Sequence, residues 1–242
     1  GIGYYLVKQL LSENYNVTVL DLKVDNLNEL CKEYDSLLPM VCDVRDLKQM
    51  KICVEESVKK YGSIDCAIHN ACLCTFESME QTEEETYRDV MDVNYYGALH
   101  LSQAVLPYMK SQKNGRVIFT SSGVGVMGFV NISPYASSKG AIETLAKCLN
   151  IEYQNYGISF HIFHPPLTRT KSAEPLPVPK EFMADPKKVG IGLAKHIQNK
   201  SFIICHSFGQ KIQTLVCYLF PIRMGKFMSK MTAKYKAEKD KI

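Results

Sequence analysis

Ser122, Tyr135 and Lys139 are the residues whose types and spacing are best suited to chemistry. In a helix, a Tyr-x-x-x-Lys spacing places a phenol and an ammonium on one face, one turn apart. The ammonium stabilises phenolate and lowers a tyrosine pKa that is ordinarily about 10. A tyrosine tuned in this way can exchange a proton with the oxygen of an alcohol or ketone near neutral pH. The three residues therefore predict acid–base chemistry at a carbon–oxygen bond.

The Tyr-x-x-x-Lys spacing becomes specific only through its surroundings. It occurs at three places in the sequence: Tyr4/Lys8, Tyr135/Lys139 and Tyr235/Lys239. Only the middle pair follows a predicted strand and a Ser-Ser-Gly turn, and Ser122 precedes its tyrosine by thirteen residues. We therefore assign the predicted chemistry to the middle pair.

The start of the chain predicts dinucleotide binding. Gly1-Ile2-Gly3 opens a predicted helix, and Asp21 follows eighteen residues later at the end of a predicted strand. Glycines let the backbone approach a pyrophosphate at a helix N-terminus, and the carboxylate accepts hydrogen bonds from ribose hydroxyls. A carboxylate at Asp21 would also repel a 2′-phosphate, which favours NAD over NADP. Taken alone, Asp21 is equally well interpreted as an ordinary turn residue.

Short apolar strands alternate with longer helical segments along residues 1–205, a pattern typical of an α/β fold with a parallel sheet covered on both faces. Strands are predicted at 17–20, 39–43, 66–68, 116–119, 159–163 and 202–205. Helices are predicted at 2–11, 46–61, 82–110, 134–156 and 187–199. Ligands of such sheets bind at the carboxyl ends of the strands. Polar candidates follow those ends: Asp21, Asp43, Asn70, Ser122 and the 164–170 loop.

Composition narrows the class of protein. The 242 residues are 46% hydrophobic, which excludes disorder and suits one catalytic domain. The net charge is +4, but residues 223–242 hold seven basic and two acidic residues, so the body is near neutral and no nucleic-acid surface is expected. Nine cysteines without a CxxC pair indicate reduced thiols, and the cluster His69 to Cys74 lacks a second ligand pair for a metal. We expect a cytoplasmic protein or one at a cytosol-facing membrane periphery.

Further segments match, in order, the motifs of one enzyme family. Gly1-Ile2-Gly3 matches the end of a TGxxxGxG motif, Asp43-Val44 a pair that contacts adenine, and Asn70-Ala71 part of an NNAG motif. Pro165 and Thr170 match the ends of a PGxxxT motif on the nicotinamide side. Through these motifs the chain resembles a short-chain dehydrogenase/reductase. The resemblance implies a Rossmann-type doubly wound parallel sheet, a nicotinamide dinucleotide, and a homodimer or homotetramer.

The resemblance also assigns catalytic roles. Tyr135 matches the general acid/base, and Ser122 the residue that orients the substrate oxygen. Lys139 matches the lysine that lowers the tyrosine pKa and holds the nicotinamide ribose. Asn94 matches the asparagine that holds a catalytic water and supports a proton relay. The implied reaction is hydride transfer between NAD(H) and a secondary alcohol or ketone.

The chain departs from the family pattern at several positions. The TGxxx segment and the strand before it are absent ahead of Gly1, so the first strand of the fold is expected to be missing. Cys72 stands where a glycine is usual, and His69 replaces an asparagine in what we interpret as a structural substitution. Pro166 replaces the glycine of the PG pair, which fixes φ and removes an N–H donor. These changes keep open a non-catalytic dinucleotide-binding scaffold or redox sensor as the alternative function.

The last two segments bear on the substrate and on partners. Residues 165–170 also resemble the PPxTxT segment of 3-ketosphinganine reductases, which favours an apolar or lipid-like substrate. Residues 206–242 form a predicted C-terminal extension in which apolar, aromatic and basic residues alternate. Such a composition is typical of a segment in a membrane interface. A cap over the substrate cleft or a dimer contact is the competing interpretation.

Overall fold

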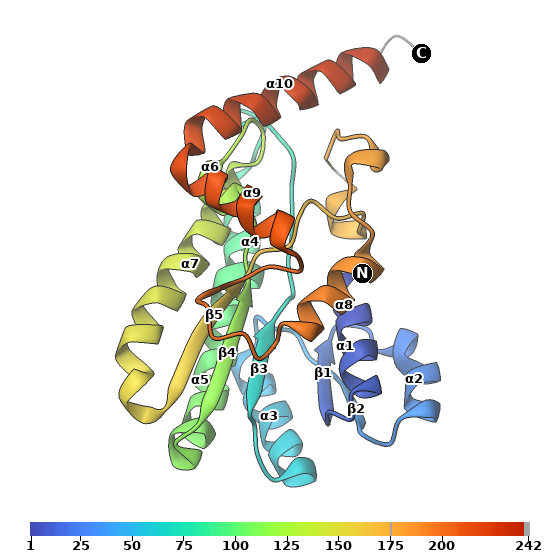
Figure 1. Ribbon diagram of the computed structural model, residues 1–242, viewed down its shortest axis with the longest axis vertical. Coiled ribbons are helices and arrows are strands. Elements are labelled where there is room, and N and C mark those ends of the chain that lie inside the picture. The colour runs from blue at the N-terminus through green and yellow to red at the C-terminus, as the bar shows by residue number, and fades with distance from the viewer. Residues whose placement is uncertain (175, 240–242) are drawn as a thin grey trace.

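The computed structural model describes residues 1–174 and 176–239 and shows six parallel strands among them (Figure 1). Strands β1 (Val17–Asp21) and β2 (Leu37–Val41) form one two-stranded sheet. Strands β3 (Cys66–His69), β4 (Gly115–Thr120), β5 (Ile158–Phe163) and β6 (Ile203–Ile204) form a second sheet in that order. Every pairing is parallel, as the alternating pattern predicts.

Helices cover both faces of the larger sheet. One layer contains α3 (Leu47–Tyr61), α5 (Gly97–Gln112) and α7 (Ser133–Tyr153), and the opposite layer contains α1 (Ile2–Ser12) and α8 (Pro186–Lys195). The ends of these helices follow local chemistry. Asp46 accepts hydrogen bonds from two amides at the start of α3, and Gly62 ends that helix with φ of 84°. Asp185 caps α8 directly before Pro186.

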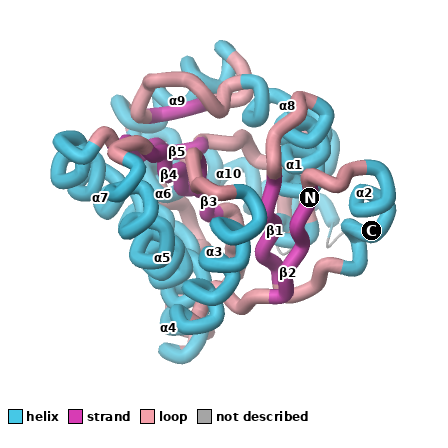
Figure 2. Tube along the Cα trace, turned by 90° about the horizontal axis from the view of Figure 1, so that it is seen from below, coloured by secondary structure: helices cyan, strands magenta, loops and turns pink. Residues whose placement is uncertain are grey.

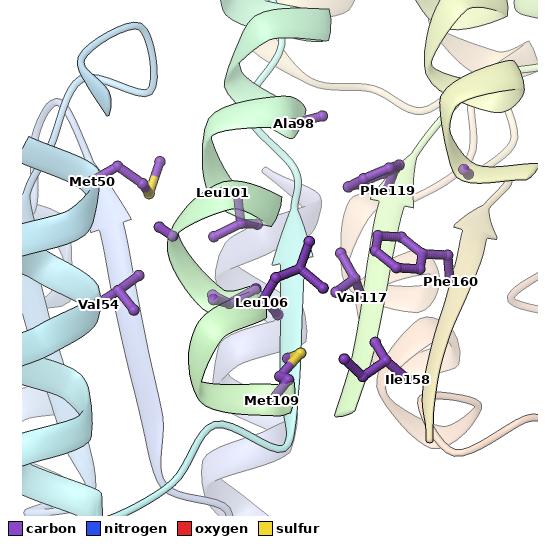
Figure 3. Close-up of a cluster of buried hydrophobic side chains, with 14 of the residues drawn as sticks. Met50, Val54, Ala98, Leu101, Leu106, Met109, Val117, Phe119, Ile158 and Phe160 are labelled. Atoms are coloured by element: carbon purple, nitrogen blue, oxygen red, sulfur yellow. The ribbon is translucent and has the colours of Figure 1, made fainter. Parts of the chain in front are cut away.

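The main core lies between α3, α5 and strands β4 and β5 (Figure 3). Val117, Phe119 and Phe160 are completely buried there, and the Phe119 and Phe160 ring centroids are 5.9 Å apart. Residues on the other side of β4 and β5 contact α1 and α8, where Ile118 and Phe163 are equally buried. Packing on both faces therefore fixes the strands that carry the predicted catalytic end.

The two sheets are not hydrogen-bonded to each other, and Figure 2 shows β1 and β2 lying apart from β3. A cavity runs between β1 and β3, because Val17, Val19, Cys66 and Ile68 all line it. These four residues are only partly buried, unlike their counterparts on β4 and β5. The cavity therefore separates the two parallel sheets.

Several predicted elements differ from the observed ones in their bounds. The helix expected over 82–110 is α4 (Glu84–Met91), a π-helical turn (Asp92–Tyr96) and then α5. The remaining elements include the short helices α2 (Asn28–Glu33) and α6 (Val124–Met127). The helix expected over 134–156 corresponds to α7, and the strand expected over 202–205 shortens to β6.

The predicted C-terminal extension consists of two helices, α9 (Phe208–Leu219) and α10 (Pro221–Lys239). They lie at the end of the molecule towards which β4 and β5 point (Figure 1). Helix α10 packs closely on the segment after α6, since a Cβ at Gly225 would lie 2.4 Å from the Gly128 carbonyl oxygen. The Ser229 hydroxyl accepts a hydrogen bond from the Val130 amide at 3.2 Å. The last three residues of the extension lie outside the described residues.

Candidate active site

A cavity of about 1350 Å³ runs between the two sheets from the amino ends of the strands to their carboxyl ends. It brings together every residue predicted to contact the dinucleotide, although these residues come from segments spread over the first 170 positions. The lining includes Gly1, Ile2, Gly3, Asp21, Asp43, Val44, Asn70, Ala71, Tyr135, Lys139, Pro165 and Thr170. Ser122 lines the same cavity. The sequence-based grouping of these residues is therefore reproduced in space.

The catalytic candidates meet where β4 ends beside α7. Ser122 follows β4, while Tyr135 and Lys139 lie one turn apart on α7, which begins with Ser133-Pro134. Ser122 lies close enough to Tyr135 for its hydroxyl to lower the pKa of the tyrosine. The Lys139 Nζ lies 5.5 Å from the centroid of the Tyr135 ring. A serine, a phenol and an ammonium are thus adjacent at one point of the cavity wall.

Burial dominates the electrostatics of this pair. Removal from water raises the pKa of Tyr135 well above its ordinary value, Cys72 and Cys74 raise it further, and the nearby Ser122 hydroxyl lowers it in part. Burial also lowers the pKa of Lys139, whose Nζ donates to the Thr120 carbonyl oxygen at 2.8 Å. The pKa of Tyr135 is therefore raised, whereas the Tyr-x-x-x-Lys spacing predicts a lowered value. The reason is that desolvation disfavours the charged form of both groups.

Asn94 lies in the π-helical turn and is completely buried. Its Oδ1 accepts a hydrogen bond from the Leu73 amide at 2.8 Å, and its Nδ2 donates to the Leu73 carbonyl oxygen at 3.0 Å. Nδ2 also donates to the Ser138 hydroxyl at 2.9 Å. Asn94 therefore joins the 72–74 loop to α7 beside Lys139, the predicted catalytic lysine. Its role in a proton relay stays a prediction.

The dinucleotide end of the cavity forms where α1 begins. A Cβ at Gly1 would meet Thr170 Cγ2 at 3.8 Å, and a Cβ at Gly3 would lie 3.0 Å from Asn70 Nδ2. The helix N-terminus therefore faces the 164–170 loop and the end of β3 across a narrow space. A side chain at Gly3 would enter that space. Backbone amides at a helix N-terminus are the donors that a pyrophosphate requires, so these residues fit a dinucleotide.

The carboxylates of the predicted adenosine end differ in their surroundings. Asp21 is exposed at the end of β1, and its Oδ1 accepts a hydrogen bond from the Lys23 amide at 3.3 Å. Asp43 forms an ion pair with Arg45 at 2.7 Å, and this guanidinium holds the pKa of Asp43 below its usual value. Asp21 is therefore the carboxylate with oxygen free to accept from ribose hydroxyls.

The departures from the family motifs have distinct environments. His69 is buried at the end of β3, and burial lowers its pKa to about 3, so the ring is neutral. A Cβ at Gly97 would lie 2.7 Å from His69 Nε2, which shows how closely α5 covers the ring. This placement agrees with a structural role. Cys72 and Pro166 both line the cavity, and the Pro166 carbonyl oxygen accepts a hydrogen bond from the Thr168 hydroxyl at 2.7 Å.

A buried polar cluster behind the catalytic lysine was not expected from the sequence. Glu143 lies one turn beyond Lys139 on α7, and its Oε1 accepts hydrogen bonds from the Ser121 hydroxyl at 2.8 Å and interacts with His164 Nε2 at 2.8 Å. Its Oε2 accepts a hydrogen bond from the Tyr218 hydroxyl of α9. The pKa of Glu143 is lowered, because these hydrogen bonds and His164 outweigh its burial. The only sequence signal was the continuation of Tyr-x-x-x-Lys to Tyr-x-x-x-Lys-x-x-x-Glu.

A doubly wound parallel sheet with a glycine-bounded dinucleotide site and a Ser–Tyr–Lys group at its carboxyl edge defines a class of nicotinamide-dependent oxidoreductase folds. Comparison with known proteins agrees, since the model of the short chain dehydrogenase family matches residues 1–180. The chain belongs to this family.

Relatives and solved structures are similar over most of the chain. The 3-oxoacyl-[acyl-carrier-protein] reductase FabG of Thermotoga maritima is 33% identical over 73% of this chain and 74% of its own. The 3-ketodihydrosphingosine reductase of Bos taurus is 26% identical over 92% of this chain and 73% of its own. A short-chain dehydrogenase structure from Streptomyces avermitilis superposes with a TM-score of 0.80 at 21% identity, covering 99% of this chain and 94% of the other.

Proposed function

We propose that this protein transfers hydride between NAD(H) and an apolar, lipid-like secondary alcohol or ketone. The observation that carries the proposal is that Ser122, Tyr135 and Lys139 line one cavity together with the residues predicted to contact the dinucleotide. Acid–base groups and a cofactor site in one cavity are what a carbon–oxygen redox reaction needs.

The residues divide the chemistry between them. A bound nicotinamide dinucleotide supplies or accepts the hydride. Ser122 donates a hydrogen bond to the substrate oxygen, and Tyr135 delivers a proton to that oxygen during reduction or removes it during oxidation. Lys139, buried beneath the tyrosine, holds the nicotinamide ribose and stabilises phenolate when it forms. Burial keeps Tyr135 protonated, which suits proton donation to a ketone.

The proposed preference for NAD depends on Asp21. Its exposed carboxylate at the end of β1 can accept from ribose hydroxyls and would repel a 2′-phosphate. Similar folds are known with either cofactor: a Brucella melitensis 3-ketoacyl reductase structure contains NADH, and a Burkholderia cenocepacia gluconate 5-dehydrogenase structure contains NADP. The preference is therefore argued from this chain's own carboxylate.

The substrate side of the cavity is lined mainly by apolar side chains, with Gln210, Gln213 and Thr214 of α9 as polar ones. Beyond the serine and tyrosine it is lined by side chains from α6, the 128–132 turn, the 165–178 segment and the C-terminal helices. They include Val124, Met127, Phe129, Ile132, Leu167, Leu176, Val178, Cys217 and Met228. Such a lining suits a hydrocarbon chain better than a sugar. The names of two relatives, a 3-oxoacyl reductase and a 3-ketodihydrosphingosine reductase, support a ketone on an acyl-type chain.

Two further parts of the proposal concern the location of the protein in the cell and its oligomeric state. All nine cysteines are free thiols, which supports a location in the cytoplasm or at a cytosol-facing membrane periphery. Assembly as a homodimer or homotetramer rests on the family alone.

The test is a turnover assay with a matched pair of variants. Tyr135→Phe should abolish oxidation of NADH by a panel of short-chain and long-chain ketones and leave NADH binding intact by fluorescence titration. Tyr156→Phe changes an exposed tyrosine in the short helical turn that follows α7, and this variant should behave as wild type. Tighter NADPH than NADH binding would overturn the Asp21 argument. Dinucleotide binding by the wild type with no turnover of any ketone would favour the scaffold instead.

A further inference from the structure

Helix α9 presents large apolar side chains to the outside. Phe208, Ile212, Leu215 and Leu219 are 78%, 50%, 56% and 61% exposed. Their spacing of four, three and four residues places them on one face of the helix. Four large apolar residues in one exposed stripe are unusual for a surface helix and indicate a surface that meets another apolar phase.

The opposite face of α9 is polar and buried. Gln210, Thr214 and Cys217 are at most 8% exposed and line the catalytic cavity, and Tyr218 reaches Glu143 behind the lysine. In a usual surface helix the apolar face is buried and the polar face is exposed, whereas α9 shows the opposite arrangement. It forms a wall with the active-site cavity on one side and the apolar stripe on the other.

The charges along α9 and the first part of α10 are of one sign. Residues 207–235 contain five basic residues and no acidic residue. Arg223, Lys226 and Lys230 are exposed on the first part of α10, where Ile222 and Phe227 are also 67% and 55% exposed. Basic side chains beside exposed apolar ones suit the interface of an anionic bilayer, in which the apolar groups enter the acyl boundary and the cations meet phosphates.

We propose that the α9 stripe and the start of α10, defined as residues 208, 212, 215, 219, 222, 223, 226, 227 and 230, dock on the surface of an anionic phospholipid membrane. The proposal concerns docking on the surface of the bilayer. Among the helices that the structure describes, none is long and apolar enough to cross a membrane. A second copy of the chain fits this surface less well. A two-fold contact places the same patch on both partners, so the two sets of cations would face each other.

Docking in this way would place the bilayer next to the apolar part of the catalytic cavity. Met228 of α10 and Cys217 of α9 line that part from the inside, one or two helical turns from the exposed residues. A lipid-like ketone could then move between membrane and site without crossing water. This step rests on the proposed function, whereas the docking itself depends only on the exposed residues.

The experiment measures co-sedimentation of the full chain with vesicles, in the absence of cofactor and substrate. Wild type should bind vesicles of phosphatidylcholine with phosphatidylserine and bind phosphatidylcholine alone more weakly, and added salt should reduce the difference. Ile212→Ser with Leu215→Ser should lower the partition coefficient by at least about tenfold for each side chain. Lys226→Glu with Lys230→Glu should remove the dependence on phosphatidylserine, by about fivefold for each charge.

A matched control separates docking from general loss of apolar surface. Ile52→Ser with Ile151→Ser removes two side chains that are 60% and 69% exposed on α3 and α7, and this variant should sediment like wild type. Wild type that stays in the supernatant with both vesicle types would overturn the proposal. So would an Ile212→Ser, Leu215→Ser variant that binds vesicles normally but changes from dimer to monomer by light scattering. Because binding is measured without turnover, failure of the proposed reaction leaves this result readable.

Discussion

The two sheets of this protein differ in burial, and each carries different residues of the candidate site. Strands β4 and β5 are buried on both faces and carry Ser122 at their carboxyl edge. Strands β1 and β2 are only partly buried, and Val41 is 57% exposed. Asp21 and Asp43, the carboxylates of the proposed adenosine end, follow these two strands. The proposed catalytic groups therefore lie on the densely packed half of the fold, and the carboxylate proposed to select the cofactor lies on the less densely packed half.

The difference extends to hydrogen bonding. On the larger sheet, Lys139 is held by the Thr120 carbonyl oxygen, and Glu143 by Ser121, His164 and Tyr218. On the smaller sheet, Asp21 has one long hydrogen bond to a neighbouring amide. A buried hydrogen-bond network restricts the geometry of its side chains, whereas an exposed carboxylate can adapt to its ligand. Four predictions test this contrast, beginning with the largest effect.

The largest expected effect separates catalysis from cofactor selection. Lys139→Met keeps most of the length of a fully buried side chain but removes its charge and its hydrogen bond to the Thr120 carbonyl oxygen. Turnover should fall by about 10²- to 10⁴-fold. Asp21→Ala should instead raise KM for NADH and narrow the difference from NADPH while kcat changes little. Steady-state kinetics with both dinucleotides measures both, and a large loss of kcat in Asp21→Ala would remove the proposed division.

The next prediction compares the stability of the two sheets. Ile118→Ala on β4 empties a completely buried site between two layers and should lower the free energy of unfolding by about 2–5 kcal/mol. Val19→Ala on β1 removes less material from a partly buried position beside the cavity, so the loss should be about 1 kcal/mol. Urea denaturation followed by circular dichroism measures both values. Equal losses would show that β1 is as tightly packed as β4.

Much of the fold follows from sequence because parallel strands buried on both faces are continuous apolar runs. Val117, Ile118 and Phe119 belong to such a run, and the matching helices have the apolar period that covers a sheet. The π-helical turn could not be predicted in this way. It surrounds Asn94, whose side chain bonds to Leu73, twenty-one residues away. The distortion depends on a tertiary contact that no local propensity records.

The candidate site shows the same limit. Ser122, Tyr135 and Lys139 could be found because two of them share one helix face and the third follows the adjoining strand. The Glu143 cluster could not, since Tyr218 joins it from α9, seventy-five residues along the chain. The sequence also predicted a lowered Tyr135 pKa, because spacing reports the ammonium but not the burial that raises the pKa. Desolvation depends on the whole surrounding fold.

The third prediction concerns His69, which lies at the end of β3 where the larger sheet faces the smaller one. Folded, its pKa is about 3, whereas an unfolded histidine titrates near 6.5. The contribution to stability is therefore present above pH 6.5 and is lost as pH falls towards 3, by about 2 kcal/mol at pH 5. His69→Asn should remove this contribution to the fall in unfolding free energy between pH 7 and pH 5, whatever the stability of the variant at pH 7. The same change at exposed His196 should leave the pH dependence unaltered.

The smallest effect tests how the C-terminal helices are tied to the catalytic half. Tyr218→Phe keeps the ring but removes the hydrogen bond to Glu143 Oε2, at an expected cost of about 1.5 kcal/mol of unfolding free energy. The lowered pKa of Glu143 gives stability above its unfolded value, which is lost as pH falls through the folded one. Losing a donor should raise the folded pKa, so acid unfolding of Tyr218→Phe should begin at a higher pH than in wild type or in Tyr156→Phe. An unchanged acid midpoint would mean that α9 is held to α7 by packing alone. The hydrogen-bonded network of the densely packed half would then not extend from Glu143 to α9.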